Sequence, residues 1–219
     1  MISIFLYLLL FFAPYESLFI LSNDVIIGNQ TWMNENLDES CFANGDAIPQ
    51  AHNAKELKYA CENKQPVWCY YNFCFFYGYK YGKLYNYYAV KDKRGLAPNG
   101  YHIPTNKEFL DLVNFLGGEG YAGKHLKYTS GWDSVNNRDG NGNNSSYFSA
   151  LPGGSASDPT CDGAGQEGIW WSLPSNDEDV ITAFGIFSDE NNIYSLDQHD
   201  ICFMYTGDIT AYSVRCIKD

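Results

Sequence analysis

One stretch of the sequence organises the rest of the chain: residues 104–118, which read PTNKEFLDLVNFLGG. Thr105 and Glu108 form a capping box, in which each side chain accepts a hydrogen bond from a backbone N–H that is otherwise left unpaired. Apolar residues then recur at helical spacing, at Phe109, Leu112, Val113 and Leu116. Gly117 and Gly118 end the pattern, because glycine readily adopts the left-handed conformation that closes a helix. The stretch therefore predicts a helix over residues 105–116.

Outward from this helix, the sequence indicates short strands separated by long loops. A second, less regular helix is expected at Ala51–Glu62, and a strand–turn–strand at Val25–Met33. The other strand candidates are Lys83–Val90, Tyr147–Leu151, Ile169–Ser172, Val180–Phe187 and Tyr212–Ile217. Residues 130–146 are rich in Gly, Asn, Asp and Ser and are expected to form a loop. Strands grouped at both ends around a helix predict an α+β fold with short antiparallel sheets.

Composition limits the class of protein. The chain has 219 residues, of which 45% are hydrophobic and 18% are charged, so it holds enough apolar material for one folded domain. With 14 Lys and Arg against 26 Asp and Glu, its formal net charge is −12. That charge argues against nucleic acid as a partner, because phosphate binding requires a basic face.

The N-terminus has the pattern of a secretory leader. Residues 4–12 form an uninterrupted apolar run, and Pro14 and Glu16 then interrupt the pattern that a spanning helix would need. We expect a signal peptide at residues 1–22 and a mature domain at residues 23–219, located outside the cell or on its surface. No transmembrane helix is expected after cleavage. The alternative is an uncleaved membrane anchor at the same residues.

Seven cysteines fit an exported protein, in which disulfide bonds are stable. All of them are disulfide candidates: Cys41, Cys61, Cys69, Cys74, Cys161, Cys202 and Cys216. The first four lie close together in the sequence, so we expect a local bridge among them. The odd number leaves at least one thiol free or available for pairing between molecules. A zinc site is the competing interpretation, but Cys69 and Cys74 supply only one of the two ligand pairs that structural zinc usually takes.

Aromatic residues are concentrated in residues 67–88, where 12 of 22 positions are Phe, Tyr or Trp. In one interpretation they fill the core of a loop-rich fold, which we favour for Trp68, Tyr85 and Tyr88. In the other they form a rigid amphipathic contact surface, and the stretch Tyr77–Tyr81 is the candidate for it.

Eight short blocks match motifs of a known family, in the order in which the family has them. They are residues 27–37, 44–49, 68–71, 81–90, 94–105, 148–154, 170–172 and 213–219. Through these blocks the chain resembles the Fibrobacter succinogenes major paralogous domain over residues 25–219. The resemblance implies a C-type-lectin-like fold with two helices, a short sheet joining the chain ends and a long irregular loop region. It also implies a distant relation to the formylglycine-generating enzymes.

The resemblance has a departure that concerns the cysteines. Some family members carry a Cys where this chain has Ala97, and in them that residue would pair with the Cys of the terminal motif, here Cys216. The partner is missing in this chain, so the bonding of Cys216 is open. Most of the other cysteines lie outside the usual motifs, which indicates an unusually disulfide-stabilised member.

Calcium is the candidate cofactor. Asp139, Asn141 and Asn143 place oxygen ligands at alternate positions, as hard cations prefer. When Asp139 is counted as the first position of an EF-hand loop, the twelfth is Ala150, which offers no side-chain oxygen. The calcium-binding motifs of sugar-binding C-type lectins are also absent, so a flexible Asn/Gly loop is the alternative.

No catalytic residue is expected. The four histidines do not have the spacing of a helical metal site, and His102 best suits a structural histidine just before the predicted helix. The resemblance to formylglycine-generating enzymes implies a low-weight alternative, an enzyme of that type, but no motif maps the required pair of active-site cysteines.

We therefore expect a non-enzymatic binding module whose partner is an extracellular glycan or protein. The candidate contact residues are Trp132, Tyr147, Trp170, Trp171, Tyr77 and Tyr79. Of these, Trp170 and Trp171 suit a core better than a contact surface. The alternative is a structural component of an extracellular assembly or matrix, which would self-associate through the odd thiol and the aromatic segment.

Overall fold

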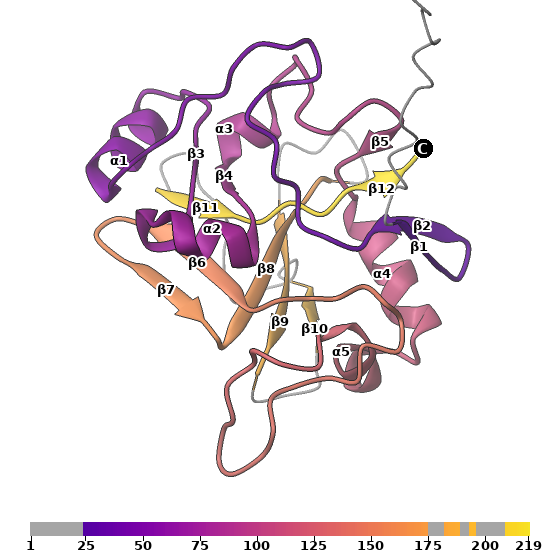
Figure 1. Cartoon of the computed structure of the whole chain (residues 1–219). Coiled ribbons are helices and arrows are strands. Elements are labelled where there is room, and N and C mark those ends of the chain that lie inside the picture. Colours follow the sequence, from indigo (N-terminus) through magenta and orange to yellow (C-terminus); the bar gives the residue numbers. More distant parts are fainter. Residues whose placement is uncertain (1–23, 175–181, 189–192, 196–208) are drawn as a thin grey trace, which may run out of the picture.

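The computed structural model describes residues 24–174, 182–188, 193–195 and 209–219 (Figure 1). Within these residues the chain has a mixed α+β fold with three antiparallel sheets, as the sequence predicts. The predicted signal peptide lies outside them. None of the helices described is both long and apolar enough to cross a membrane.

A four-stranded sheet brings the start and the end of the described chain together (Figure 1). Its order is β1 (Asp24–Ile27), β2 (Gln30–Met33), β12 (Ile217–Lys218) and β5 (Tyr101–His102). Gly28 makes the turn between the first two strands at a φ of +65°, a conformation that favours glycine. The predicted strand–turn–strand is confirmed, with Val25 opposite Trp32.

A five-stranded sheet forms the second unit of the fold. Its order is β3 (Trp68–Cys69), β4 (Leu84–Asn86), β11 (Thr210–Tyr212), β6 (Gly153–Ser157) and β7 (Cys161–Ala164). Helix α1 (Ala54–Glu62) packs on this sheet, because its Leu57 and Ala60 share one apolar cluster with Cys69 and Leu84. The second predicted helix is thereby confirmed.

A three-stranded sheet carries two of the largest core side chains, Trp170 and Trp171. It consists of β8 (Glu167–Ser172), β9 (Thr182–Phe187) and β10 (Ile193–Ser195). Successive residues of a strand point to opposite faces, so Trp170 and Trp171 enter two different apolar clusters, and both are 0% exposed. Trp132 is buried as well, and its indole N–H donates to the carbonyl of Ala150 over 3.0 Å. These three tryptophans are therefore core residues, and the expectation that they form a contact surface is wrong.

Helix α4 (Asn106–Phe115) confirms the helix that the sequence predicts over residues 105–116. The Glu108 N–H donates to the Thr105 hydroxyl over 3.3 Å, and the Thr105 N–H donates to the Glu108 carboxylate over 2.7 Å. On the buried face, Phe109 stacks on Phe184 of β9 with 4.3 Å between ring centroids. Gly117 follows the helix at a φ of +97°.

Three further α-helices were not predicted, so the expectation of two helices was too low for the part of the chain described. They are α2 (Phe75–Tyr81), α3 (Tyr87–Val90) and α5 (Glu119–Leu126). Only the first part of the predicted strand at residues 83–90 is a strand, because the Asn86 side chain accepts the Ala89 N–H over 3.0 Å and starts a helix. The predicted strand at residues 147–151 is irregular, because Tyr147 and Ser149 have φ angles of 59° and 57°.

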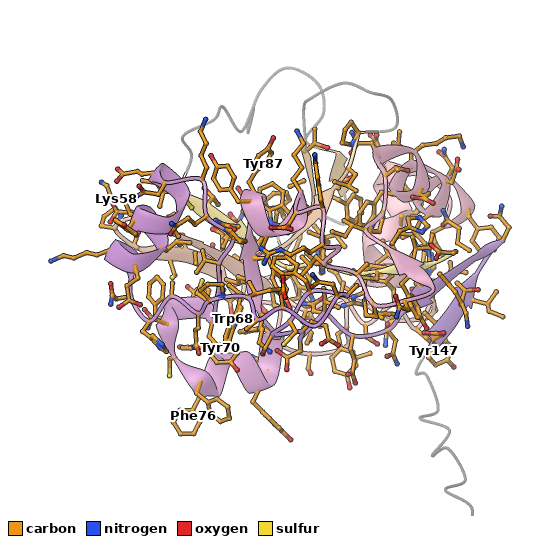
Figure 2. All side chains as sticks on the ribbon, turned by 90° about the horizontal axis from the view of Figure 1, so that it is seen from above. Lys58, Trp68, Tyr70, Phe76, Tyr87 and Tyr147 are labelled. Atoms are coloured by element: carbon orange, nitrogen blue, oxygen red, sulfur yellow. The ribbon has the colours of Figure 1, made fainter. Side chains whose placement is uncertain are left out.

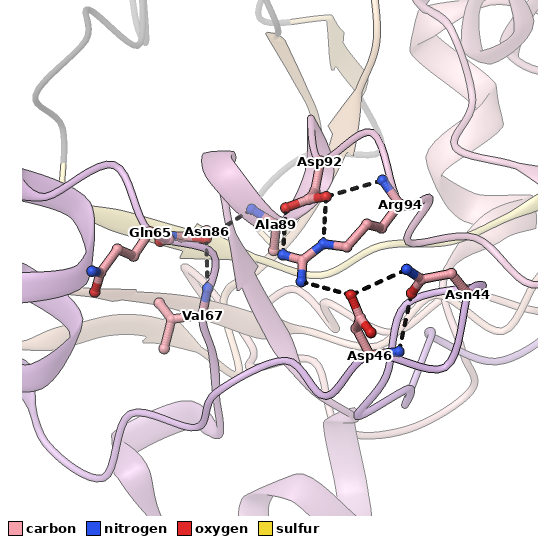
Figure 3. A network of polar contacts seen from close by, with 8 residues as sticks. All are labelled: Asn44, Asp46, Gln65, Val67, Asn86, Ala89, Asp92 and Arg94. Atoms are coloured by element: carbon pink, nitrogen blue, oxygen red, sulfur yellow. Dashed lines mark hydrogen bonds and ion pairs between the residues drawn. The ribbon is translucent and has the colours of Figure 1, made fainter.

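Polar side chains fix the loops around this framework (Figure 3). The guanidinium of Arg94 donates to the two oxygens of Asp92 over 2.9 and 2.7 Å and to Asp46 over 3.2 Å. The Asn86 amide also accepts the Val67 N–H over 3.0 Å and donates to the Gln65 carbonyl over 2.8 Å. Loops far apart in the sequence are thereby tied to β4 and α3.

The cysteines of the described residues form no disulfide bond. Six thiols are free, so the expected local bridge among the first four cysteines is not found, and Cys202 lies outside the residues described. Cys69 and Cys216 are 0% exposed, and burial raises the pKa of Cys216 to about 12. Cysteines in such positions pack as small apolar side chains. Cys41, in contrast, is exposed.

Candidate functional site

A cleft of about 630 Å³ lies against α2. Its aromatic lining comes from Tyr79 and Tyr81 on the helix and from Tyr128. Its polar lining consists of Asn34, Glu35, Asn36, Asp38, Lys80, Ser149 and Arg215. These residues belong to separate segments of the chain, and only the fold brings them together.

Gly78 sets the position of α2 against the body of the protein. A Cβ at this position would lie 2.2 Å from ring carbons of Tyr70, so only glycine lets the helix approach that ring so closely. Tyr70 packs edge-on against Trp68, with 5.1 Å between centroids, and so rests on the core. Tyr81, the last residue of α2, is buried, whereas the side chain of Tyr79 on the same helix is 92% exposed. The Tyr79 ring therefore stands free at the rim of the cleft.

The floor of the cleft is held by Arg215 and Asn36. Arg215 is 1% exposed and donates to the Asn36 amide oxygen from Nη2 over 2.7 Å and from Nε over 3.2 Å. It also donates to the carbonyl groups of Met33 and Phe148. Burial lowers the pKa of Arg215 to about 9, so the guanidinium still carries its charge at neutral pH. A buried cation held by neutral oxygens is thus part of the floor.

The charges that line the cleft balance one another. The lining contains two acidic residues, Glu35 and Asp38, and two basic residues, Lys80 and Arg215, so it has no formal net charge. Asp38 is also engaged, because the buried Lys83 ammonium donates to its carboxylate over 2.7 Å. The same ammonium lies 4.8 Å from the centre of the Trp68 ring. The site therefore offers amide, carboxylate and cationic groups beside aromatic rings, with no excess of either charge.

A second hollow of about 500 Å³ is lined by Glu108 and Asp219, the two carboxylates that contact His102. His102 Nε2 is 2.8 Å from a Glu108 carboxylate oxygen, and Nδ1 is 2.8 Å from an Asp219 carboxylate oxygen. Burial lowers the pKa of His102, but the bonds to the two carboxylates outweigh burial and raise it overall. The expectation of a hydrogen-bonded structural histidine agrees with this geometry, in which the ring joins α4 to the C-terminal segment.

The three tyrosines predicted as contact residues have different environments in the structure. Tyr79 lines the cleft. Tyr77 is 38% exposed and packs between Tyr71 and Tyr81, with centroid distances of 5.1 and 6.3 Å. Tyr147 is 70% exposed but is not part of the cleft lining, and Figure 2 shows it far from Phe76 of α2.

In the predicted calcium loop, the side-chain oxygens that would bind the ion accept hydrogen bonds from N–H groups of the protein instead. One Asp139 carboxylate oxygen accepts the backbone and side-chain N–H groups of Asn141, over 3.0 and 2.7 Å. The side-chain oxygens of Asn141 and Asn143 accept backbone N–H groups of Trp132 and Ser145, each over 3.0 Å. Among the residues described, no three His, Cys, Asp or Glu side chains gather as metal ligands. The structure thus does not support a calcium site at Asp139, Asn141 and Asn143.

Comparison with known proteins identifies the family. The family model described as Fibrobacter succinogenes major domain matches residues 25–218. The chain belongs to the Fibrobacter succinogenes major domain family. No curated protein and no solved structure matches it.

Several residues of this Fibrobacter succinogenes major domain line the cleft but were not predicted as site residues, above all Asn36 and Arg215. The family blocks were the signal that would have indicated them. The first block supplies residues 34–36, the fourth supplies residues 81 and 82, the sixth supplies residues 149 and 151, and the last supplies residue 215. Tyr79, Lys80 and Tyr128 lie outside the blocks. The cleft therefore combines a floor made largely of family motifs with a rim that lies outside those motifs.

Proposed function

We propose that this chain is a secreted or surface-displayed binding module that holds a saccharide in the cleft against α2. The exposed ring of Tyr79 beside amide and charged groups is the observation that carries the proposal. A sugar ring has apolar C–H faces and hydroxyl groups around its edge. Aromatic rings suit the faces, and amide and carboxylate groups suit the hydroxyls, which both donate and accept hydrogen bonds.

The module is proposed to have a C-type-lectin-like fold and to act by binding alone. The sheet that joins β2 to β12 near the chain ends supports that fold, together with the long irregular segment between α5 and β6. Neither His nor Cys lines the cleft, which supports binding over thiol-dependent chemistry of the formylglycine-generating type.

A glycan array tests the proposal, with the mature protein in the presence and absence of calcium. We expect calcium-independent binding that Tyr79→Ala lowers by about tenfold, because one ring-stacking contact is lost. Tyr121→Ala is the matched control, since Tyr121 is 69% exposed but lies on α5 and outside the cleft. No binding to any saccharide, or equal losses in both variants, would overturn the proposal.

A structural role in an extracellular assembly is the second candidate. The observation that favours it is the exposure of Phe75 and Phe76, at 67% and 83%, since large exposed apolar groups often mark contacts between proteins. Sedimentation of the mature protein over a range of concentrations distinguishes this candidate, because self-assembly would depend on concentration and on Phe76.

A further inference from the structure

A stripe of exposed aromatic rings continues the cleft along α2. Phe75, Phe76 and Tyr79 are 67%, 83% and 92% exposed. Residues three and four apart on a helix are neighbours, so Tyr79 shares one face with both phenylalanines. Figure 2 shows Phe76 pointing away from the body of the protein. Because Tyr79 also lines the cleft, the stripe begins where the cleft ends.

The stripe is braced from below. Phe75 packs edge-on against Tyr70, with 5.9 Å between centroids, and Phe76 packs against Phe75 at 6.4 Å. Tyr70 in turn rests on Trp68 and fills the space beside Gly78. Phe75, which contacts both Tyr70 and Phe76, therefore loses little conformational freedom when a ligand covers it. Phenylalanine has no polar group, so this part of the surface offers only apolar contact.

Charge limits the ligands that fit. The cleft lining is balanced, and the whole chain has a formal net charge of −12. A polyanion would meet repulsion from the protein as a whole without a basic patch in the cleft to offset it. A neutral ligand meets no such penalty.

Resting on the proposed function, we propose that the ligand is an extended neutral saccharide chain. One part of the chain occupies the cleft, and successive sugar units stack on Tyr79, Phe76 and Phe75. The amide and charged groups of the cleft bind the hydroxyls of the first part, whereas the stripe contributes contact area that only a longer chain reaches. Affinity therefore increases with chain length.

Calorimetric titration with paired short and long probes tests this. The probes are the disaccharides and hexasaccharides of the malto, cello, manno and xylo series, with hexagalacturonic acid as the anionic probe. We expect at least one neutral hexasaccharide to bind about tenfold or more tightly than its disaccharide. Phe76→Ala is expected to lower hexasaccharide affinity by about fivefold and to leave disaccharide affinity unchanged. Hexagalacturonic acid is expected to bind more weakly than the neutral probes.

Phe115→Ala is the matched control, because Phe115 is 64% exposed but lies on α4 and outside the cleft. Equal affinity for disaccharide and hexasaccharide would overturn the inference while the proposed function stands. Tighter binding of hexagalacturonic acid would overturn the choice of a neutral chain. Absence of all saccharide binding would overturn both proposals. Concentration-dependent dimers that Phe76→Ala abolishes would instead assign the stripe to a second copy of this chain.

Discussion

The side chain of Asn36 joins four segments of the protein at one point. Its amide oxygen accepts N–H groups from Arg215 and from the Trp170 indole, the latter over 2.8 Å. Its amide nitrogen donates to the Tyr81 carbonyl over 2.8 Å and to the Ser213 hydroxyl over 3.3 Å. Both ends of the amide are thus in use, and α2 is anchored to β8 and to the C-terminal segment.

Asn36→Ala is expected to lower the free energy of unfolding by about 2–4 kcal/mol. The substitution removes the acceptor of Nε and Nη2 of the buried Arg215 guanidinium and of the Trp170 indole N–H, and an unpaired buried donor is costly. Urea denaturation measures the change. Asn114→Ala, on the exposed side of α4, is the control and is expected to change stability by less than about 0.5 kcal/mol. Equal effects would contradict the role given to Asn36.

His102 gives the fold a dependence on pH. The pKa of His102 is raised in the folded state. Its contribution to the free energy of unfolding is therefore complete below the unfolded pKa of about 6.5 and is lost as pH rises through the folded pKa. Burial raises the pKa of Glu108, but the Thr105 N–H, His102 and the Thr105 hydroxyl outweigh burial and lower it. The contribution of Glu108 to the free energy of unfolding is therefore complete above its unfolded pKa of about 4.3 and is lost as pH falls through the folded pKa.

The two signs together predict a window in which the contact between His102 and the carboxylates is strongest, between about pH 4.5 and pH 6.5. We expect the difference in unfolding free energy between the wild type and His102→Gln to be largest there and to shrink toward pH 9. Chemical denaturation at a series of pH values measures it. A difference that stays constant over this range would show that the imidazole does not act as the shared cation.

Among the elements, α2 is the one whose placement decides the cleft. Gly78→Ala is expected to lower unfolding free energy by about 1–3 kcal/mol, because the added methyl group overlaps the Tyr70 ring and forces the helix or the ring to move. Saccharide affinity falls with it, since Tyr79 moves with the helix. The double variant Gly78→Ala with Tyr70→Leu, measured by the same denaturation experiment, is expected to recover part of the loss. An alanine variant as stable as the wild type would contradict the close approach.

The elements differ in how well the sequence predicts them. Helix α4 was predicted because its cap, its periodicity and its terminal glycines all act within one continuous stretch. Helix α2 was missed because its aromatic residues carry no cap and no apolar period, and a tertiary contact at Gly78 holds it. At residues 84–90 the aromatic pattern favours a strand throughout, but one side-chain cap, Asn86, turns the chain into a helix.

At the scale of the whole molecule, the α+β class and the family could be predicted, but the cleft could not. Its floor joins Asn36 to Arg215, which are 179 positions apart, through hydrogen bonds that no local pattern encodes. Trp170 and Trp171 were named both as contact candidates and as better suited to the core, and in the structure, where β8 pairs with β9, both are buried. Tyr79 was predicted as a contact residue because tyrosine is rigid and amphipathic and therefore suits contact surfaces.

The accessibility of the thiols tests the packing of the whole molecule. With a maleimide at pH 8, we expect Cys41 to react first among the six cysteines that the structure describes, because it is exposed. Cys69 and Cys216 are expected to react only after unfolding, since burial hides both and raises the pKa of each. Peptide mass spectrometry reads the labelled positions, and labelling in urea is the control. Native labelling of Cys69 at the rate of Cys41 would contradict this core.

Backbone amide NMR tests the saccharide cleft most directly. The mature, nitrogen-15-labelled protein is titrated with a neutral hexasaccharide that it binds, and shifts are followed residue by residue. We predict that the largest shifts fall in residues 34–38 and 78–82, with Ser149 and Tyr128 also affected. Shifts confined to α5 or to the loop at residues 130–146, with the cleft residues unchanged, would contradict the assignment of the site.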